Sequence, residues 1–123
     1  MKSFTDLAQS EQLAEILPLK SADMLYTPLG NNYPWVWHEE VKLLEKNATP
    51  CWSVAALLEV IPQEIFDGKY VINITEGLNN RWVLTYDHFE NRNHSDYSLS
   101  IGADNLVDAC VEMIVKLHEL YLL

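Results

Sequence analysis

The sequence has few basic residues. Eight lysines and arginines stand against eighteen aspartates and glutamates in 123 residues, which gives a formal net charge of −10 at pH 7. A chain of this charge repels phosphate backbones and anionic lipid headgroups, so direct nucleic-acid binding and membrane binding are not expected. The acidic residues are spread along the chain, as is typical of a solvated surface. A folded mimic of nucleic acid would distribute its carboxylates in the same way.

Cysteine, glycine and long apolar runs are also scarce. Cys51 and Cys110 form no Cys-x-x-Cys pair, and we expect both to be buried free thiols in helices. The four glycines form no phosphate loop or dinucleotide fingerprint, so no cofactor is expected. The N-terminus lacks the apolar core of a signal peptide, and no stretch approaches the ~20 apolar residues of a membrane span. These absences predict a soluble, cytoplasmic protein.

The remaining composition is that of an ordinary globular chain, with 49% hydrophobic and 21% charged residues. The length predicts a single domain over residues 1–123. Hydrophobic periodicity predicts an α+β fold. In this fold an antiparallel sheet, made of a three-strand meander and an N-terminal hairpin, packs against two or three helices.

The N-terminal half is predicted to contain one helix and one hairpin. The helix is expected to begin near Ser3 and to end at Leu17, because the following proline cannot extend it. Two extended segments, 24–27 and 33–41, flank a Gly-Asn-Asn sequence at 30–32. Glycine and asparagine tolerate the positive φ of a hairpin turn, so these segments are predicted to pair.

The C-terminal half is predicted to contain a helix and then the meander. Ser53 can cap a helix that ends at Ile61, before the next proline. Apolar and polar residues then alternate with a period of two around 70–75, 82–86 and 97–101, which predicts three strands with one apolar face.

The last helix is predicted to carry a core stripe and an acidic row. Asp104 is expected to be its cap. Apolar residues recur at helical spacing at Leu106, Cys110, Met113, Leu117 and Tyr121. Asp104, Asp108 and Glu112 lie along one side of the helix. We call these three residues the acidic ridge. Its carboxylates are explained if they form a solvated face of the helix, and the alternative is that they bind a basic partner.

Two similarities between the halves are compatible with an internal duplication of one helix and one hairpin, over 4–41 and 53–86. A helix-ending segment at 13–18 parallels one at 57–62, and an asparagine-rich turn before a tryptophan occurs in both halves. Helix-then-proline and asparagine-rich turns are also common enough to coincide.

Two segments contain residue types that catalysis or metal binding uses. His88 and His94 lie in a polar segment over 87–96 and could serve a metal-dependent hydrolase, but their wide spacing fixes no ligand geometry. Cys51 and Ser53 open a helix, yet Ser53 is needed as a cap and no Gly-x-Ser-x-Gly elbow surrounds it. The sequence therefore does not favour an enzyme.

An aromatic row and an apolar C-terminus remain. Tyr33, Trp35 and Trp37 would project from one side of a strand. A small domain rarely leaves three such rings in water, so core packing is expected; if exposed, they would be the leading binding-site candidate. Leu122 and Leu123 would fray unless they dock on the domain or on a second subunit.

Three segments, Pro18–Met24, Trp52–Glu59 and Asn105–Ala109, resemble small uncharacterised proteins of gut-bacterial prophages and mobile elements. The resemblance implies an accessory role in a mobile element and transfers no catalytic residue. The order of helix, three strands and helix over 53–120 also looks like the double-stranded RNA-binding arrangement. That family binds RNA through a basic cluster at the start of its last helix. This chain has Asp104 and Asp108 there, so the charge argues against RNA binding.

The sequence thus favours a non-enzymatic protein-interaction module, with a protein partner or as a homodimer. An acidic mimic that occupies a nucleic-acid-binding protein is the alternative, and a metal-dependent hydrolase is the third hypothesis. The candidate partner surface comprises Tyr33, Trp35, Trp37, Asp104, Asp108, Glu112, Leu122 and Leu123.

Overall fold

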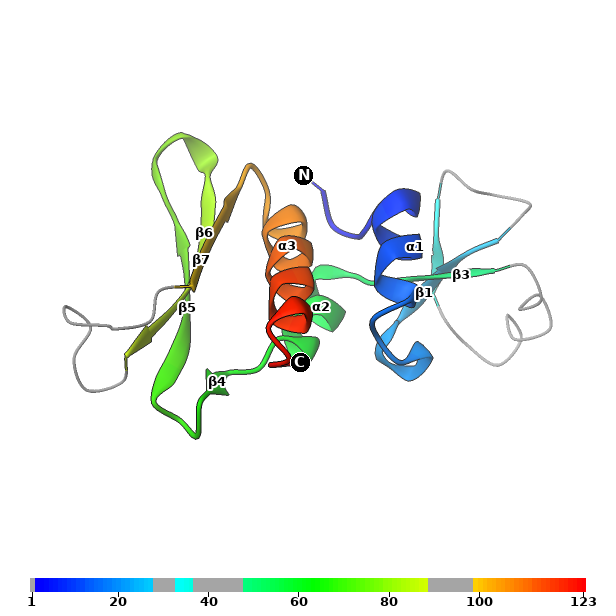
Figure 1. Cartoon of the computed structure of the whole chain (residues 1–123). Coiled ribbons are helices and arrows are strands. Elements are labelled where there is room, and N and C mark those ends of the chain that lie inside the picture. The colour runs from blue at the N-terminus through cyan, green and yellow to red at the C-terminus, as the bar shows by residue number, and fades with distance from the viewer. Residues whose placement is uncertain (1, 28–32, 37–47, 89–98) are drawn as a thin grey trace. The chain divides into compact units, whose positions relative to one another are not determined.

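The computed structural model describes residues 2–27, 33–36, 48–88 and 99–123 (Figure 1). Backbone contacts group them into two compact units, an N-terminal unit over Lys2–Val60 and a C-terminal unit over Ile61–Leu123. Each unit contains helices and its own antiparallel sheet, so the predicted α+β fold is confirmed. The single-domain organisation and the internal duplication stay predictions.

The N-terminal unit is built around a three-stranded sheet with the order β2-β1-β3. Its elements are α1 (Leu7–Ala14), the 3₁₀-helix η1 (Leu19–Ser21), β1 (Met24–Tyr26), β2 (Trp35–Val36), β3 (Thr49–Cys51) and α2 (Val54–Val60). The predicted hairpin is confirmed, because Leu25 pairs with Trp35 in antiparallel register. The prediction that Cys51 lies in a helix is wrong, since it ends β3. Pro50 concealed this strand, because proline is rare in a sheet except on edge strands such as β3.

The first helix begins later than predicted. Asp6, and not Ser3, is the N-cap: its Oδ1 accepts from the Gln9 N–H at 2.8 Å, and the Gln9 side chain accepts from the Asp6 N–H at 3.1 Å. Residues before Asp6 are extended because they pair elsewhere in the unit, with the Thr5 N–H donating to the Trp52 carbonyl at 3.0 Å. Tertiary pairing thus overrides the local helix signal over 3–5.

The cap predicted for the second helix is confirmed. Ser53 Oγ accepts from the Ala56 N–H at 3.2 Å. Asp23 in turn holds Ser53, accepting from its N–H at 2.9 Å and from its hydroxyl. Trp52 before the cap and Leu57 within the helix, the two positions of a hydrophobic staple, are both fully buried.

The C-terminal unit contains a four-stranded sheet with the order β4-β5-β6-β7. Its elements are β4 (Glu64–Ile65), β5 (Tyr70–Glu76), the 3₁₀-helix η3 (Leu78–Asn80), β6 (Trp82–His88), β7 (Leu99–Ala103) and α3 (Leu106–Glu119). The predicted antiparallel meander is confirmed, and α3 lies along one face of the sheet against β6 and β7 (Figure 1). Leu84, Tyr86 and Leu99 on that face are buried.

The start of the last helix differs from the prediction by one residue. Asn105, not Asp104, is the N-cap, and its Oδ1 accepts from the Asp108 N–H at 2.8 Å. The predicted core stripe is also wrong at two residues. Leu106 is only half-buried, and Tyr121 is exposed beyond the end of the helix. The buried residues of α3 are Val107, Ala109, Cys110, Val111, Met113, Ile114 and Leu117. Within the described ranges, no helix has the length and apolar character needed to cross a bilayer.

Candidate protein-interaction surface

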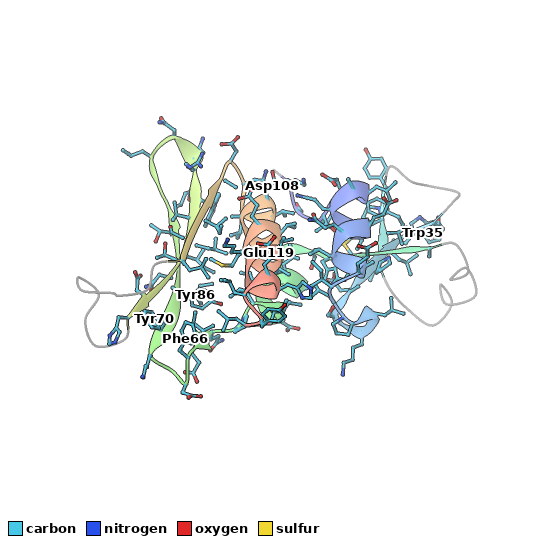
Figure 2. All side chains as sticks on the ribbon, viewed as in Figure 1. Trp35, Phe66, Tyr70, Tyr86, Asp108 and Glu119 are labelled. Atoms are coloured by element: carbon cyan, nitrogen blue, oxygen red, sulfur yellow. The ribbon has the colours of Figure 1, made fainter. Side chains whose placement is uncertain are left out.

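The β2 strand and the segment just before it carry a group of exposed apolar side chains. Tyr33 is 74% exposed, Trp35 49% and Val36 66%. We call these three residues the β2 surface. Paired residues in a sheet project to the same face, so Trp35 lies on the same face as its fully buried partner Leu25. Trp35 remains half-exposed because β2 is a short edge strand at the margin of that face (Figure 2). Val36 projects to the opposite face.

The expectation that the aromatic row packs in the core is therefore wrong for Tyr33 and Trp35. Trp37, the third member of the row, lies outside the described residues. The exposed Val36, on the opposite side of the strand, was not among the predicted site residues. Side chains on a two-residue strand at the edge of a sheet have few neighbours on either face, so both sides stay exposed. The alternation of residues along the strand does not show this.

Both edges of this sheet are unsuited to pairing with another strand. Pro34 immediately precedes β2 and Pro50 lies within β3, and neither has an N–H to donate to an added strand. Short edge strands and edge prolines are the devices that proteins use against edge-to-edge association. The β2 surface is therefore suited to contact through side chains and not through backbone pairing.

A buried polar cluster fixes the N-terminal end of this unit. Thr5 is its centre: its Oγ1 lies 2.7 Å from Ser10 Oγ and accepts from the Trp52 N–H at 3.1 Å. The Thr5 carbonyl accepts from the Tyr26 hydroxyl at 2.7 Å and from the Cys51 thiol at 3.4 Å. The cluster is neutral, and its hydroxyl groups are satisfied by one another and by the backbone. These hydrogen bonds connect α1, β1 and β3, so the cluster has a structural role.

The electrostatics of the cysteines argue against thiol chemistry. Burial raises the pKa of the Cys51 thiol, and hydrogen bonds from Thr5 and Ser10 oppose this effect only in part. Burial likewise raises the pKa of Cys110 to about 12. Both thiols are therefore protonated at neutral pH, and protonated thiols are poor nucleophiles. The prediction that both cysteines are buried and free is confirmed.

The acidic ridge on α3 is only partly free. Asp104 is exposed, and its nearest described cation is Arg81, whose Nη1 lies 3.8 Å away. Asp108 is half-buried, and its carboxylate accepts from Asn105 Nδ2 at 2.8 Å, so it belongs to the helix cap (Figure 2). Glu112 is exposed. The structure thus places Arg81 beside the first carboxylate of the ridge. A role as a nucleic-acid mimic stays a prediction.

The apolar C-terminus is exposed except at one residue. Leu122 is half-buried, whereas Leu120, Tyr121 and Leu123 are exposed. Docking of Leu122 and Leu123 on a second subunit stays a prediction.

The histidine segment is described only at its start. The Asp87 carboxylate accepts from Asn73 Nδ2 at 2.5 Å, and the His88 ring packs edge-on against Tyr70, with ring centres 5.3 Å apart. His94 and Asp96 lie outside the described residues. Across 2–27, 33–36, 48–88 and 99–123, no group of three or more His, Cys, Asp or Glu side chains is arranged to hold a metal ion.

Comparison with known proteins finds no matching family, no matching curated protein and no matching solved structure.

A hairpin missed in the sequence lies beside the meander. Phe66, Asp67 and Gly68 all have positive φ, and the Lys69 N–H donates to the Phe66 carbonyl at 3.2 Å, in a turn over residues 66–69 that joins β4 to β5. Asp-Gly close to apolar residues on both sides, here Phe66 before it and Tyr70 after Lys69, is a hairpin signal and could have revealed β4. Phe66 is exposed and packs edge-on against Tyr70, with ring centres 5.8 Å apart (Figure 2).

Proposed function

We propose that this protein is a non-enzymatic protein-interaction module that binds a partner protein through the β2 surface. The observation that carries the proposal is the exposure of two aromatic side chains at the β2 margin: Trp35 on the strand and Tyr33 two residues before it, with Val36 exposed on the opposite face. Tyrosine and tryptophan are enriched among the residues that dominate binding energy at protein interfaces. An accessory role in a mobile element, which the sequence resemblance implies, belongs to the same proposal.

The size of the β2 surface fits the centre of an interface. A buried aromatic side chain contributes about 150–250 Å², so the exposed parts of Tyr33 and Trp35 together amount to roughly 250 Å². At about 25 cal/mol per Å², their burial would contribute on the order of 6 kcal/mol before the costs of association. A standard interface buries about 800 Å² per partner, so further polar contacts would surround this patch.

The net charge favours a different protein over a second copy as the partner. Each copy carries a formal charge of −10, and two such chains repel each other at long range. A partner with a basic rim around an apolar pocket would instead be attracted to the site. A homodimer through the β2 surface is the competing outcome of the test.

Site-specific photo-crosslinking tests the proposal. Benzoylphenylalanine replaces Tyr33 in the full-length protein, which is expressed in its native cells and irradiated. A matched probe replaces Leu19, an exposed apolar residue of the same unit outside β2. We expect a discrete heterologous crosslink from position 33, absent from position 19 and abolished by Trp35→Ser.

Two outcomes would contradict the proposal. Crosslinks from position 33 that equal those from position 19, or that survive Trp35→Ser, would show that the β2 surface does not select a partner. A crosslink only to a second copy, with a dimeric mass by light scattering, would replace the proposed partner by a homodimer.

A further inference from the structure

The C-terminal unit offers an open sheet edge on β5. β4 pairs only with the first two residues of β5, Tyr70 and Val71, and the Ile72 N–H makes one more bond, to the Gln63 carbonyl at 3.0 Å. Figure 1 shows β4 only at the lower end of β5, far from the β5–β6 turn. Residues 73–76, which we call the β5 edge, therefore have β6 on one side and no described strand on the other.

The path of the chain before β4 explains why this edge is open. Pro62 has no N–H to donate to β5. Its carbonyl accepts instead from the Tyr86 hydroxyl at 2.5 Å, and Tyr86 lies on β6, on the face of the sheet that α3 covers. The chain is thus held over that face at Pro62 and joins the edge only from Gln63 onward.

Two hydrogen bonds establish which backbone groups of the β5 edge point outward. The Ile72 N–H points away from β6, toward β4, and successive residues of a strand alternate in direction. At the other end, the Gly77 N–H donates to the Arg81 carbonyl at 2.6 Å, so residue 77 points across the hairpin. Both bonds place the N–H and C=O groups of Ile74 and Glu76 on the open side. Among the described residues, no backbone group pairs with them there.

The side chains of the β5 edge lack the usual protection against strand pairing. No proline or bulge interrupts it, and the register with β6 is continuous from Tyr70 to Glu76. Ile74 is 40% exposed although it shares a face with the buried core, because α3 packs on β6 and β7. Glu76 is exposed and is the one charge on this edge. An unpaired, straight edge with an exposed apolar side chain is a template for strand addition.

We propose that the β5 edge binds an extended segment of a partner protein as an added antiparallel strand, in line with β4. Residues opposite Ile74 and Glu76 in this register are two positions apart and face the same side of the sheet. The segment would therefore carry a basic residue opposite Glu76 and, two positions further toward its C-terminus, an apolar residue opposite Ile74. The chain's net charge of −10 favours such a basic segment over a second copy of the protein.

Peptide selection on the full-length protein tests this inference. The probe is a phage-displayed library of random linear peptides, selected on the wild-type protein and counted again on Ile74→Pro. Proline at position 74 removes an outward N–H that no β6 bond uses, so the meander is expected to survive. Ile74→Val, which keeps both the N–H and an apolar side chain, is the matched control.

We expect the enriched peptides to show a basic residue two positions before an apolar one. Ile74→Pro should weaken their binding about tenfold or more, and Ile74→Val by no more than about twofold. N-methylation of alternate peptide amides should abolish binding while leaving the peptide charge unchanged. In amide hydrogen exchange, bound peptide should protect Ile74 and Glu76. Trp35→Ser should leave all of these results unchanged, because the β2 surface is a separate site.

Three results would overturn the inference. The first is a selection that enriches no peptide on the wild-type protein over Ile74→Pro. The second is equal binding of N-methylated and unmodified peptides, which would show that charge alone is recognised. The third is protection of Ile74 and Glu76 in the protein alone with a dimeric mass, which would make a second copy the occupant.

Discussion

Replacement of Tyr121 by glycine is expected to stabilise the protein. The end of α3 is a Schellman motif: the Tyr121 N–H donates to the His118 carbonyl at 3.1 Å, and the Leu122 N–H donates to the Leu117 carbonyl at 2.9 Å. In this motif the residue after the C-cap adopts a left-handed conformation and is usually glycine. Here the position is occupied by Tyr121, with φ of 59°.

The magnitude follows from two opposing effects. The left-handed conformation costs a residue with a Cβ about 1–2 kcal/mol. Glycine avoids this cost but loses about 0.5–1 kcal/mol through the greater entropy of the unfolded chain. The Tyr121 side chain is 94% exposed, so its removal sacrifices little packing. The net expectation for Tyr121→Gly is a gain of about 0.5–1 kcal/mol, or roughly 2–6 °C in the melting temperature.

Thermal unfolding followed by circular dichroism, together with urea titration, measures this gain. Tyr121→Ala is the control, because alanine keeps the Cβ and therefore the strain, and it should lie within about 0.5 kcal/mol of the wild type. A melting temperature of Tyr121→Gly at or below that of the wild type would refute the reasoning. It would mean that the tyrosine ring stabilises the folded state more than its exposure indicates.

Three further predictions concern the N-terminal unit. Thr5→Val removes the hydroxyl that bonds Ser10 and the Trp52 N–H, and should lower the free energy of unfolding by about 2–3 kcal/mol in urea titration; an unchanged midpoint would contradict a structural role. Thr27→Val should raise it by about 1 kcal/mol in the same assay, because the buried Thr27 hydroxyl has no described partner. Desolvation raises the pKa of Tyr26 from 10.0 to about 12, so its contribution to stability is complete below pH 10 and is lost as the pH rises through 12. The free energy of unfolding should therefore fall by about 1.4 kcal/mol per pH unit between these values, and Tyr26→Phe should flatten this fall.

Local sequence signals correctly predicted the elements that depend on the pattern of neighbouring residues. The meander follows from strict alternation over β5, β6 and β7, and the α2 cap follows from Ser53 and its place before an apolar run. The cap of α3 was misplaced by one residue, because aspartate and asparagine are almost equal as caps and only the backbone angles choose between them.

Elements that depend on distant partners were not predictable in this way. β3 contains Pro50, and it forms a strand because it pairs with β1 at the edge of the sheet. Residues 3–5 leave the first helix because the segment around Trp52 pairs with them. For β4 the signal was present in Asp67-Gly68, but a strand of two residues is too short for periodicity to detect.

The sequence by itself determined the composition of the surface and the faces of the longer elements. A charge of −10, a period-two meander and an amphipathic last helix are properties of residue types and spacing alone. Only the tertiary structure decided which apolar residues remain in water. Whether Trp35 or Ile74 is buried depends on what packs against its strand. β2 is an edge strand of two residues, so Trp35 stays half-exposed. The chain before β4 is held at Pro62 by Tyr86 and pairs with β5 only from Gln63 onward, so the β5 edge and Ile74 stay exposed.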